Sequence, residues 1–257
     1  MKILAVGDVC GTPGCEAVLK KLPLFKKEKG IDVVIANGEN SAEGNGILPS
    51  SAEVLFSSGV DVITGGNHTL RRKEIYPFLD ENEFLIRPAN LPDSVPGSGI
   101  SIIDKGYVKI AVINLMGTIY MDSINCPFKT ADKMISSAKS EGAEIIVVDF
   151  HAEATSEKRA LGFYLDSKVT AFFGTHTHVQ TADNQILPGG TAYITDLGMT
   201  GVNDSVLGVE KEIVIKRMKD KIPERFKFAS GSTSLNGCLF EIDRRSKKAL
   251  SAELVSI

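Results

Sequence analysis

The stretch Val169-Thr170-Ala171-Phe172-Phe173-Gly174-Thr175-His176-Thr177-His178 carries the pattern that organises this chain. Its β-branched and aromatic run is typical of a buried strand, which we expect to stop at His176 and His178. Residues i and i+2 of an extended chain face the same side, so the two imidazoles should point one way, roughly 6 to 7 Å apart at their backbones. Each could then reach one ion of a metal pair. Because a lone His-x-His motif is weak, a pair of surface histidines in a loop is the alternative.

Other apolar runs also have strand character, and helical patterns separate them. The predicted strands are residues 3–6, 32–36, 60–64, 99–104, 107–115, 144–148, 169–173 and 191–194. The predicted helices are residues 15–29, 49–58, 70–82, 131–140 and 155–165. Alternation of strand and helix indicates a parallel sheet, and the hairpin of 99–104 with 107–115 makes the sheet mixed. Residues 116–128 are predicted to be an ordered loop. Residues 212–257 are predicted to be rich in strands, with a hairpin of 237–243 and 249–257.

Composition places the chain among ordinary globular proteins. It has 257 residues, 43% hydrophobic and 24% charged, with a formal net charge of -3. No linker or repeat divides it, so a single domain over residues 1–257 is predicted. The charge gives no general attraction to nucleic acid or anionic membrane, and no signal peptide or uncharged run near 18 residues is found. We therefore expect a cytoplasmic enzyme that forms no stable complex with nucleic acid or membrane.

The cysteines and the basic residues suggest no further site. Cys10, Cys15, Cys126 and Cys238 form no Cys-x-x-Cys pair, so they are expected to be reduced thiols rather than zinc ligands or disulfides. The basic run at 216–227 alternates with apolar residues, and a solvated face is favoured there over a nucleic-acid surface. Exposed strands in the C-terminal third suggest a homo-oligomer.

Potential metal ligands follow five of the predicted strands. They are Asp8, Glu39 with Asn40, Asn67 with His68, His151, and His176 with His178. In an open α/β sheet the ligand site lies beyond the carboxyl ends of the strands, so these side chains should converge. All four histidines of the chain belong to the set, which scattered core or surface histidines would not explain.

Single members of this set also have structural explanations. Asn40 could be a turn residue in Gly38-Glu39-Asn40-Ser41, and Asn67 could hold a tight glycine turn. Asp8 could be the N-cap of the following helix.

The donor set favours two metal ions. Three imidazoles, two carboxylates and one or two amide oxygens exceed a tetrahedral zinc site and suit manganese or iron, with zinc or magnesium as alternatives. Glu39 is the natural bridge. With Asp8, Glu39 and a bridging hydroxide the centre keeps a charge of about +1, which a phosphodiester monoanion would neutralise. His68 directly follows Asn67 and is expected to remain free of metal, as the general acid for the leaving oxygen.

Several motifs together resemble a known enzyme family. Gly7-Asp8, Asn37-Gly38-Glu39-Asn40, Gly66-Asn67-His68 and 174–178 resemble the motif series of the calcineurin-like metallophosphoesterases. Residues 149–158, 174–183 and 193–201 more narrowly resemble the bacterial YmdB-like family of 2',3'-cyclic-nucleotide 2'-phosphodiesterases. The resemblance spans nearly the whole chain. It implies an α/β sandwich of two mixed β-sheets flanked by helices (α/β/β/α), with a dinuclear metal centre.

The resemblance also implies residue roles. One metal ion would take Asp8, Glu39, Asn40 and His178, and the other would take Glu39, Asn67, His151 and His176. His68 would be the proton donor. The implied reaction is hydrolysis of 2',3'-cyclic nucleotides to 3'-nucleotides by a metal-bridging hydroxide, with a link to RNA turnover.

The chain departs from the family pattern at a few positions. Leu70-Arg71 stands where the family has Trp-Asp, and Thr118 stands where relatives have Arg. Both are expected at the substrate entrance. Cys10 occupies the position of a histidine ligand in many other metallophosphoesterases. Two alternative functions are considered: a phosphomonoesterase or nucleotidase with the same centre, and a regulatory protein that binds RNA or protein and retains the metal site.

Overall fold

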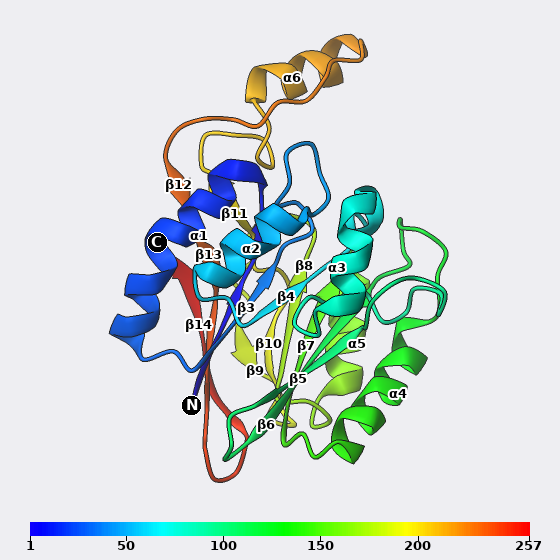
Figure 1. Cartoon of the computed structure of the whole chain (residues 1–257), viewed down its shortest axis with the longest axis vertical. Coiled ribbons are helices and arrows are strands. Elements are labelled where there is room, and N and C mark those ends of the chain that lie inside the picture. The colour runs from blue at the N-terminus through cyan, green and yellow to red at the C-terminus, as the bar shows by residue number, and fades with distance from the viewer.

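Two large mixed sheets form the centre of the structure, a computed structural model that describes residues 1–257 (Figure 1). One has the order β14-β13-β1-β3-β4, and the other has the order β5-β6-β7-β8-β10-β9. The first comprises β1 (Lys2–Val6), β3 (Val33–Asn37), β4 (Val62–Thr64), β13 (Asn236–Ile242) and β14 (Ala249–Ser256). The second comprises β5 (Ile100–Asp104), β6 (Lys109–Met116), β7 (Ile145–His151), β8 (Ala171–Thr175), β9 (Gln185–Ile186) and β10 (Ala192–Ile194). In the first sheet β1, β3 and β4 are parallel to one another, while β13 and β14 pair antiparallel on one side. In the second sheet β6, β7, β8 and β10 are parallel and the edge strands β5 and β9 pair antiparallel, which confirms the predicted mixed sheet.

Alternation along each strand divides the core into three layers. In β1, Ile3 and Ala5 join the cluster between the two sheets, while Leu4 points to the outer face of its sheet. Val147 and Val148 of β7 divide in the same way between the inner cluster and the outer face of the second sheet. Strands that are buried on both faces must be apolar at every position, which explains their unbroken runs.

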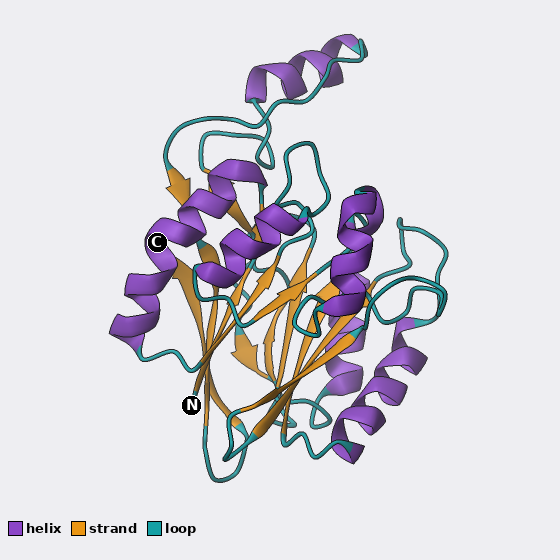
Figure 2. Ribbon diagram, in the orientation of Figure 1, coloured by secondary structure: helices purple, strands orange, loops and turns teal.

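Helices cover the outer face of each sheet and complete the predicted sandwich (Figure 2). On the first sheet lie α1 (Gly11–Lys29), α2 (Pro49–Ser57) and α3 (Tyr76–Glu81). On the second lie α4 (Pro127–Ser140) and α5 (Thr155–Leu165). A third, small sheet of β12 (Thr233–Ser234), β11 (Met199–Val202) and β2 (Asp8–Val9) was not predicted. In this sheet β11 pairs with the strand that holds Asp8.

Two predicted elements are wrong in form. The single helix expected at 70–82 consists of the 3₁₀ turns η1 (Thr69–Arg71) and η2 (Lys73–Ile75) followed by α3. Pro77 has no amide hydrogen to donate, so it is accommodated in the first turn of α3. The region after residue 212 begins with a helix, α6 (Lys211–Asp220), and not with strands. This helix projects from the body of the molecule in Figure 1, and only Val214 of its residues is buried.

Two simpler features agree with the sequence. All four cysteines are free thiols, three buried and Cys126 exposed. The loop between β6 and α4 contains neither helix nor strand, as predicted for residues 116–128 apart from its ends. None of the helices combines the length and apolar character needed to cross a bilayer.

A close approach between backbones supports the position of Asp8. The chain passes Gly198 at Gly7, where an added Cβ would lie 1.9 Å from the Gly198 carbonyl oxygen. Asp8 N then donates to the same carbonyl oxygen at 3.1 Å. Only glycine therefore fits at the residue that joins β1 to the ligand-bearing turn.

We expect Gly7→Ala to destabilise the fold by about 1–3 kcal/mol, the usual cost of overpacking a core. Gly30→Ala is the comparison, because Gly30 has a φ of 63° but no atom within 4 Å of an added Cβ. Its cost should be limited to backbone strain of about 1 kcal/mol. Urea unfolding of both variants measures the difference. A Gly7→Ala protein as stable as Gly30→Ala would contradict the argument.

Candidate metal centre

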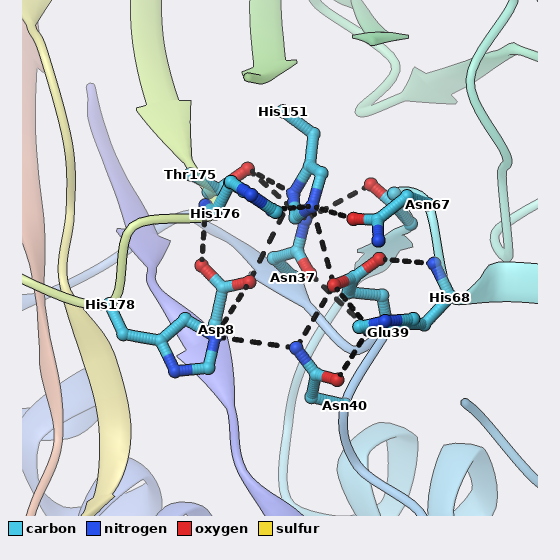
Figure 3. Close-up of polar contacts among 12 residues, drawn as sticks. Asp8, Asn37, Glu39, Asn40, Asn67, His68, His151, Thr175, His176 and His178 are labelled. Carbon is cyan, nitrogen blue, oxygen red and sulfur yellow. Dashed lines mark hydrogen bonds and ion pairs between the residues drawn. The ribbon is translucent and has the colours of Figure 1, made fainter. Parts of the chain in front are cut away.

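The predicted ligand residues all meet at the carboxyl ends of the parallel strands, between the two sheets (Figure 3). They come from β2, from the loops after β3 and β4, from the end of β7 and from the turn after β8. The residues brought together are Asp8, Glu39, Asn40, Asn67, His68, His151, His176 and His178. Asp8, Glu39 and His151 are buried, and the other histidines are partly exposed.

One group of polar atoms converges on Nε2 of His151. Asn67 Oδ1 lies 2.9 Å from this nitrogen, His176 Nδ1 lies 3.0 Å away and Glu39 Oε1 lies 3.3 Å away. Ligand atoms of Glu39, His151 and His176 are all within 4.8 Å of one another. Neighbouring ligands of one ion at about 2.1 Å lie about 3 Å apart, so these spacings fit a single divalent ion.

The other ring nitrogen of His151 is tied to a buried carboxylate through a hydroxyl. Thr175 Oγ1 donates to Asp149 Oδ1 at 2.8 Å and lies 2.9 Å from His151 Nδ1. Because its hydrogen is used on Asp149, Thr175 must accept from His151, which places a proton on Nδ1. His151 therefore presents Nε2 to the centre. Thr64 and Asn37 also donate to Asp149, which is completely buried.

His176 and His178 are fixed in a similar way. His176 Nε2 lies 3.0 Å from Glu153 Oε2, so this nitrogen carries the proton and Nδ1 faces the centre. His178 Nδ1 lies 3.3 Å from the carbonyl oxygen of Leu207, which can only accept. Nε2 of His178 is then left with its lone pair towards Asp8. Each of the three imidazoles thus directs inward the nitrogen that is free of contacts outside the centre, and this nitrogen would bind a metal ion in its unprotonated form.

A second group of atoms surrounds Asp8. Its Oδ2 accepts from the His176 backbone at 3.1 Å, but its Oδ1 is buried without a hydrogen-bond partner. The ring nitrogens His178 Nε2 and His151 Nδ1 lie 3.6 Å and 4.0 Å from Oδ1, too far for a hydrogen bond. A buried carboxylate oxygen without a partner is costly, and a bound cation would satisfy it.

Asn40 presents its nitrogen, and not its oxygen, to these groups. Nδ2 lies 2.9 Å from Glu39 Oε1 and 3.3 Å from His178 Nε2, while Oδ1 lies 3.0 Å from His68 Nδ1. A metal ligand must offer the oxygen, so the predicted role requires this amide to turn over about its terminal bond. Ligation by Asn40 stays a prediction.

Glu39 lies between the two groups and contacts both. Its Oε1 accepts from Asn40 and faces His151, while its Oε2 accepts from the His68 backbone at 2.8 Å. Burial alone would raise the pKa of Glu39, but His151 and His68 outweigh burial and hold that pKa well below its usual value. Glu39 is therefore ionised and placed as a bridge would have to be.

The pKa shifts around the centre follow from burial and from the neighbouring charges. Burial would lower the pKa of His151, yet Glu39 and Asp8 raise it to about 9. Burial and the neighbouring His151 lower the pKa of His176 to about 3, so His176 is neutral. Burial raises the pKa of Asp8, with Glu39 adding to the effect. The proton on His151 Nε2 lies among the acceptors that would surround a metal ion.

His68 stands apart from the other histidines. Its Nδ1 faces Asn40 Oδ1 and lies 3.3 Å from Glu39 Oε1, and its side chain is 26% exposed. Its Nε2 makes no hydrogen bond within the protein. An imidazole held at one nitrogen and open at the other is arranged as a proton donor to a ligand would be.

The conformation of the histidine turn differs from the expected strand. β8 ends at Thr175, and His176 and His178 have φ angles of 102° and 64°. These left-handed conformations are rare for residues with a Cβ and concentrate at functional sites. The two imidazoles thus converge because the chain turns, and not because a strand alternates.

Gly66 allows the loop after β4 to approach the centre closely. A Cβ at Gly66 would lie 2.4 Å from Glu39 Oε2 and from His151 Cδ2, so any larger residue would displace these side chains.

The positions that depart from the family pattern support the surrounding loops. Thr118 donates from its backbone and its hydroxyl to the buried carboxylate of Glu157, at 2.9 and 3.0 Å. The Leu70 side chain packs against the outer core of the first sheet, and Arg71 is exposed.

Comparison with known proteins identifies the family. The family model described as YmdB-like protein matches residues 4–255. The chain belongs to the YmdB-like family. It is 48% identical to the 2',3'-cyclic-nucleotide 2'-phosphodiesterase of Bacillus subtilis, covering 100% of this chain and 97% of that protein.

Two solved structures have the same fold. A hypothetical protein from Thermus thermophilus superposes with a TM-score of 0.93 and 38% identity, covering 100% of this chain and 99% of that one. A Mycoplasma pneumoniae protein described as a novel phosphatase superposes with a TM-score of 0.93 and 36% identity, covering 100% and 93%. The metallophosphoesterase-like family implies divalent metal ions, and the convergent atoms around His151 and the unpartnered Asp8 Oδ1 fit such ions.

For this YmdB-like protein we expect Asp8→Asn to raise the Tm of the metal-free form at pH 7. The folded-state pKa of Asp8 is raised, so its contribution favours folding at low pH and opposes it once the pH exceeds the unfolded pKa. An amide removes this cost. The same change should weaken Mn²⁺ binding by more than about tenfold.

Thermal melts with chelator and calorimetric titrations with Mn²⁺ measure both effects. Asp122→Asn is a control, because Asp122 is exposed on the loop between β6 and α4. An Asp8→Asn protein that melts below wild type without metal would show that Asp8 is stabilised by contacts within the protein.

We expect Mn²⁺ binding at pH 7 to release about one proton from His151, because a metal ligand must be neutral and the pKa of His151 is about 9 without metal. Affinity should accordingly rise with pH until about 9. Titration calorimetry in two buffers of different ionisation enthalpy counts the proton. His151→Ala should abolish that release, and equal heats in both buffers for wild type would refute the assignment.

Proposed function

We propose that the chain is a dinuclear metal-dependent phosphodiesterase that hydrolyses 2',3'-cyclic nucleotides to 3'-nucleotides. The observation that carries the proposal is the convergence of two groups of acceptor atoms that share Glu39. The substrate class is supported by the Bacillus subtilis relative, whose name is 2',3'-cyclic-nucleotide 2'-phosphodiesterase.

The proposed ligands divide between the two groups. Asp8, Glu39, Asn40 and His178 would hold one ion, and Glu39, Asn67, His151 and His176 would hold the other. When bound, two divalent ions of iron or manganese supply Lewis-acid activation of water and neutralise the charge of the phosphate.

The chain's own residues would manage the leaving group. In the proposed reaction a water oxygen forms a bond to phosphorus while the bond from phosphorus to O2' breaks, and O2' needs a proton. His68 would donate that proton from Nε2, the nitrogen without a partner in the protein. Contact of Nδ1 with Asn40 and Glu39 would keep the ring oriented.

The test compares substrates that differ in their leaving groups. We expect His68→Ala to lose about 100-fold or more in kcat on 2',3'-cyclic AMP, the usual contribution of a general acid. On bis(p-nitrophenyl) phosphate the loss should be less than about tenfold, since p-nitrophenolate leaves without protonation. Lys73→Met is the control, because Lys73 is exposed on the same segment.

Three further measurements define the reaction. The 2',3'-cyclic compound should be preferred over 3',5'-cyclic AMP and over p-nitrophenyl phosphate, and both chelator and Glu39→Ala should abolish turnover. Turnover of the monoester alone would leave the centre intact but change the substrate class to a phosphomonoesterase. Absence of any metal-dependent turnover would favour a regulatory role.

A further inference from the structure

The turn that carries His176 and His178 needs an external support. Both residues have positive φ angles, a conformation that costs about 1–3 kcal/mol for a residue with a Cβ and persists only where the surroundings impose it. The residue between them is Thr177, and its contacts identify the support.

Asp196 holds Thr177 by two hydrogen bonds to one oxygen. Thr177 N donates to Asp196 Oδ2 at 3.1 Å, and Thr177 Oγ1 donates to the same atom at 2.8 Å. Asp196 lies just beyond the end of β10, the strand beside β8 in the sheet. A side chain fixed to the neighbouring strand thus fixes the turn between the two histidines.

The same carboxylate also holds the chain beside Asp8. Gly198 N donates to Asp196 Oδ1 at 2.8 Å, and the Gly198 carbonyl accepts from Asp8 N. Met199 N then donates to the carbonyl of His178 at 3.2 Å. The two oxygens of Asp196 therefore set the positions of three proposed metal ligands relative to one another, although Asp196 contacts none of their side chains.

Lys158 forms a buried ion pair with Asp196. Its Nζ lies 2.6 Å from Asp196 Oδ2, and the side chains of both residues are at most 1% exposed. The methylenes of Lys158 pass over Gly174, where an added Cβ would lie 2.9 Å from Cδ. Burying two charges costs desolvation energy that their attraction often fails to recover. A contribution to the stability of the fold therefore does not explain why this buried ion pair is present. The need to hold Thr177 in place does explain it.

We propose that Asp196, neutralised by Lys158, is a positioning residue of the metal centre that orients His176, His178 and Asp8 without being a ligand. This inference rests on the proposed metal-dependent function. Its mechanism is geometric: without the carboxylate, Thr177 loses two acceptors and the histidine turn can relax from the left-handed conformation.

The experiment replaces the pair with apolar side chains in Lys158→Met/Asp196→Leu. Such replacements of buried ion pairs are often neutral or stabilising, so the double variant is expected to fold. We expect its affinity for Mn²⁺ to fall by about 10–100-fold, the range seen when outer partners of a metal site are removed. Arg159→Met is the matched control, since Arg159 neighbours Lys158 on α5 and pairs with Asp183.

Two readouts separate positioning from general stability. Calorimetric titration with Mn²⁺ gives the affinity, and chelated samples give the Tm and the ring ¹⁵N spectra of the histidines. The proposal predicts altered resonances of His176 and His178 in a double variant that still unfolds cooperatively. A folded double variant with wild-type affinity for Mn²⁺ and wild-type histidine spectra would overturn it.

A milder pair of variants applies if the double variant does not fold. Thr177→Val removes one hydrogen bond to Asp196 and should weaken Mn²⁺ binding by about tenfold, while Thr177→Ser keeps the hydroxyl and should bind as wild type does. Equal affinity of both variants would overturn the inference. Wild-type protein that binds no Mn²⁺ would instead overturn the proposed centre itself, and the inference with it.

Discussion

The structure depends on holding several buried polar groups close together although they repel one another. Two buried carboxylates and one ring nitrogen from each of three imidazoles point into one small space, where no hydrogen-bond donor satisfies Asp8 Oδ1. Such an arrangement is unfavourable in a low-dielectric interior unless a positive charge joins it. The rigid sandwich supplies the free energy that holds these groups together, because each is attached to the end of a buried strand.

Much of the centre follows from the sequence for a topological reason. Parallel strands place their carboxyl ends at one edge, so polar residues after successive apolar runs must meet. That rule accounts for Asp8, Glu39 and Asn67 on the first sheet and for His151 and His176 on the second. The packing of the two sheets against each other then brings both groups together. The rule does not say which atoms of these side chains point into the centre. The amide orientation of Asn40 and the left-handed turn at His176 depend on partners from distant segments, such as Asp196.

The sequence patterns do not identify the residues that orient the proposed metal ligands. Two of them, Asp149 and Lys158, are nevertheless unusual in their sequence positions. Asp149 is a carboxylate within an apolar strand, two residues before His151 and on the same side. Lys158 is a charged residue on the buried face of α5. Each signal indicates a buried partner but does not say which one. Other limits concern the fold. Strands that are buried on both faces show no alternation, so the two-sheet sandwich is expected only from the family resemblance. The region predicted to be rich in strands, residues 212–257, begins with α6 instead.

Glu39 gives the centre a further property. Its carboxylate contacts the group around His151 and the group around Asp8, so neither group can change its hold on Glu39 without affecting the other. In a centre of two ions, occupancy at one position is therefore coupled to affinity at the other. Thermodynamic linkage makes this coupling reciprocal: each ion alters the binding of its neighbour by the same factor. In the proposed centre, the order in which two ions load would therefore depend on one shared side chain.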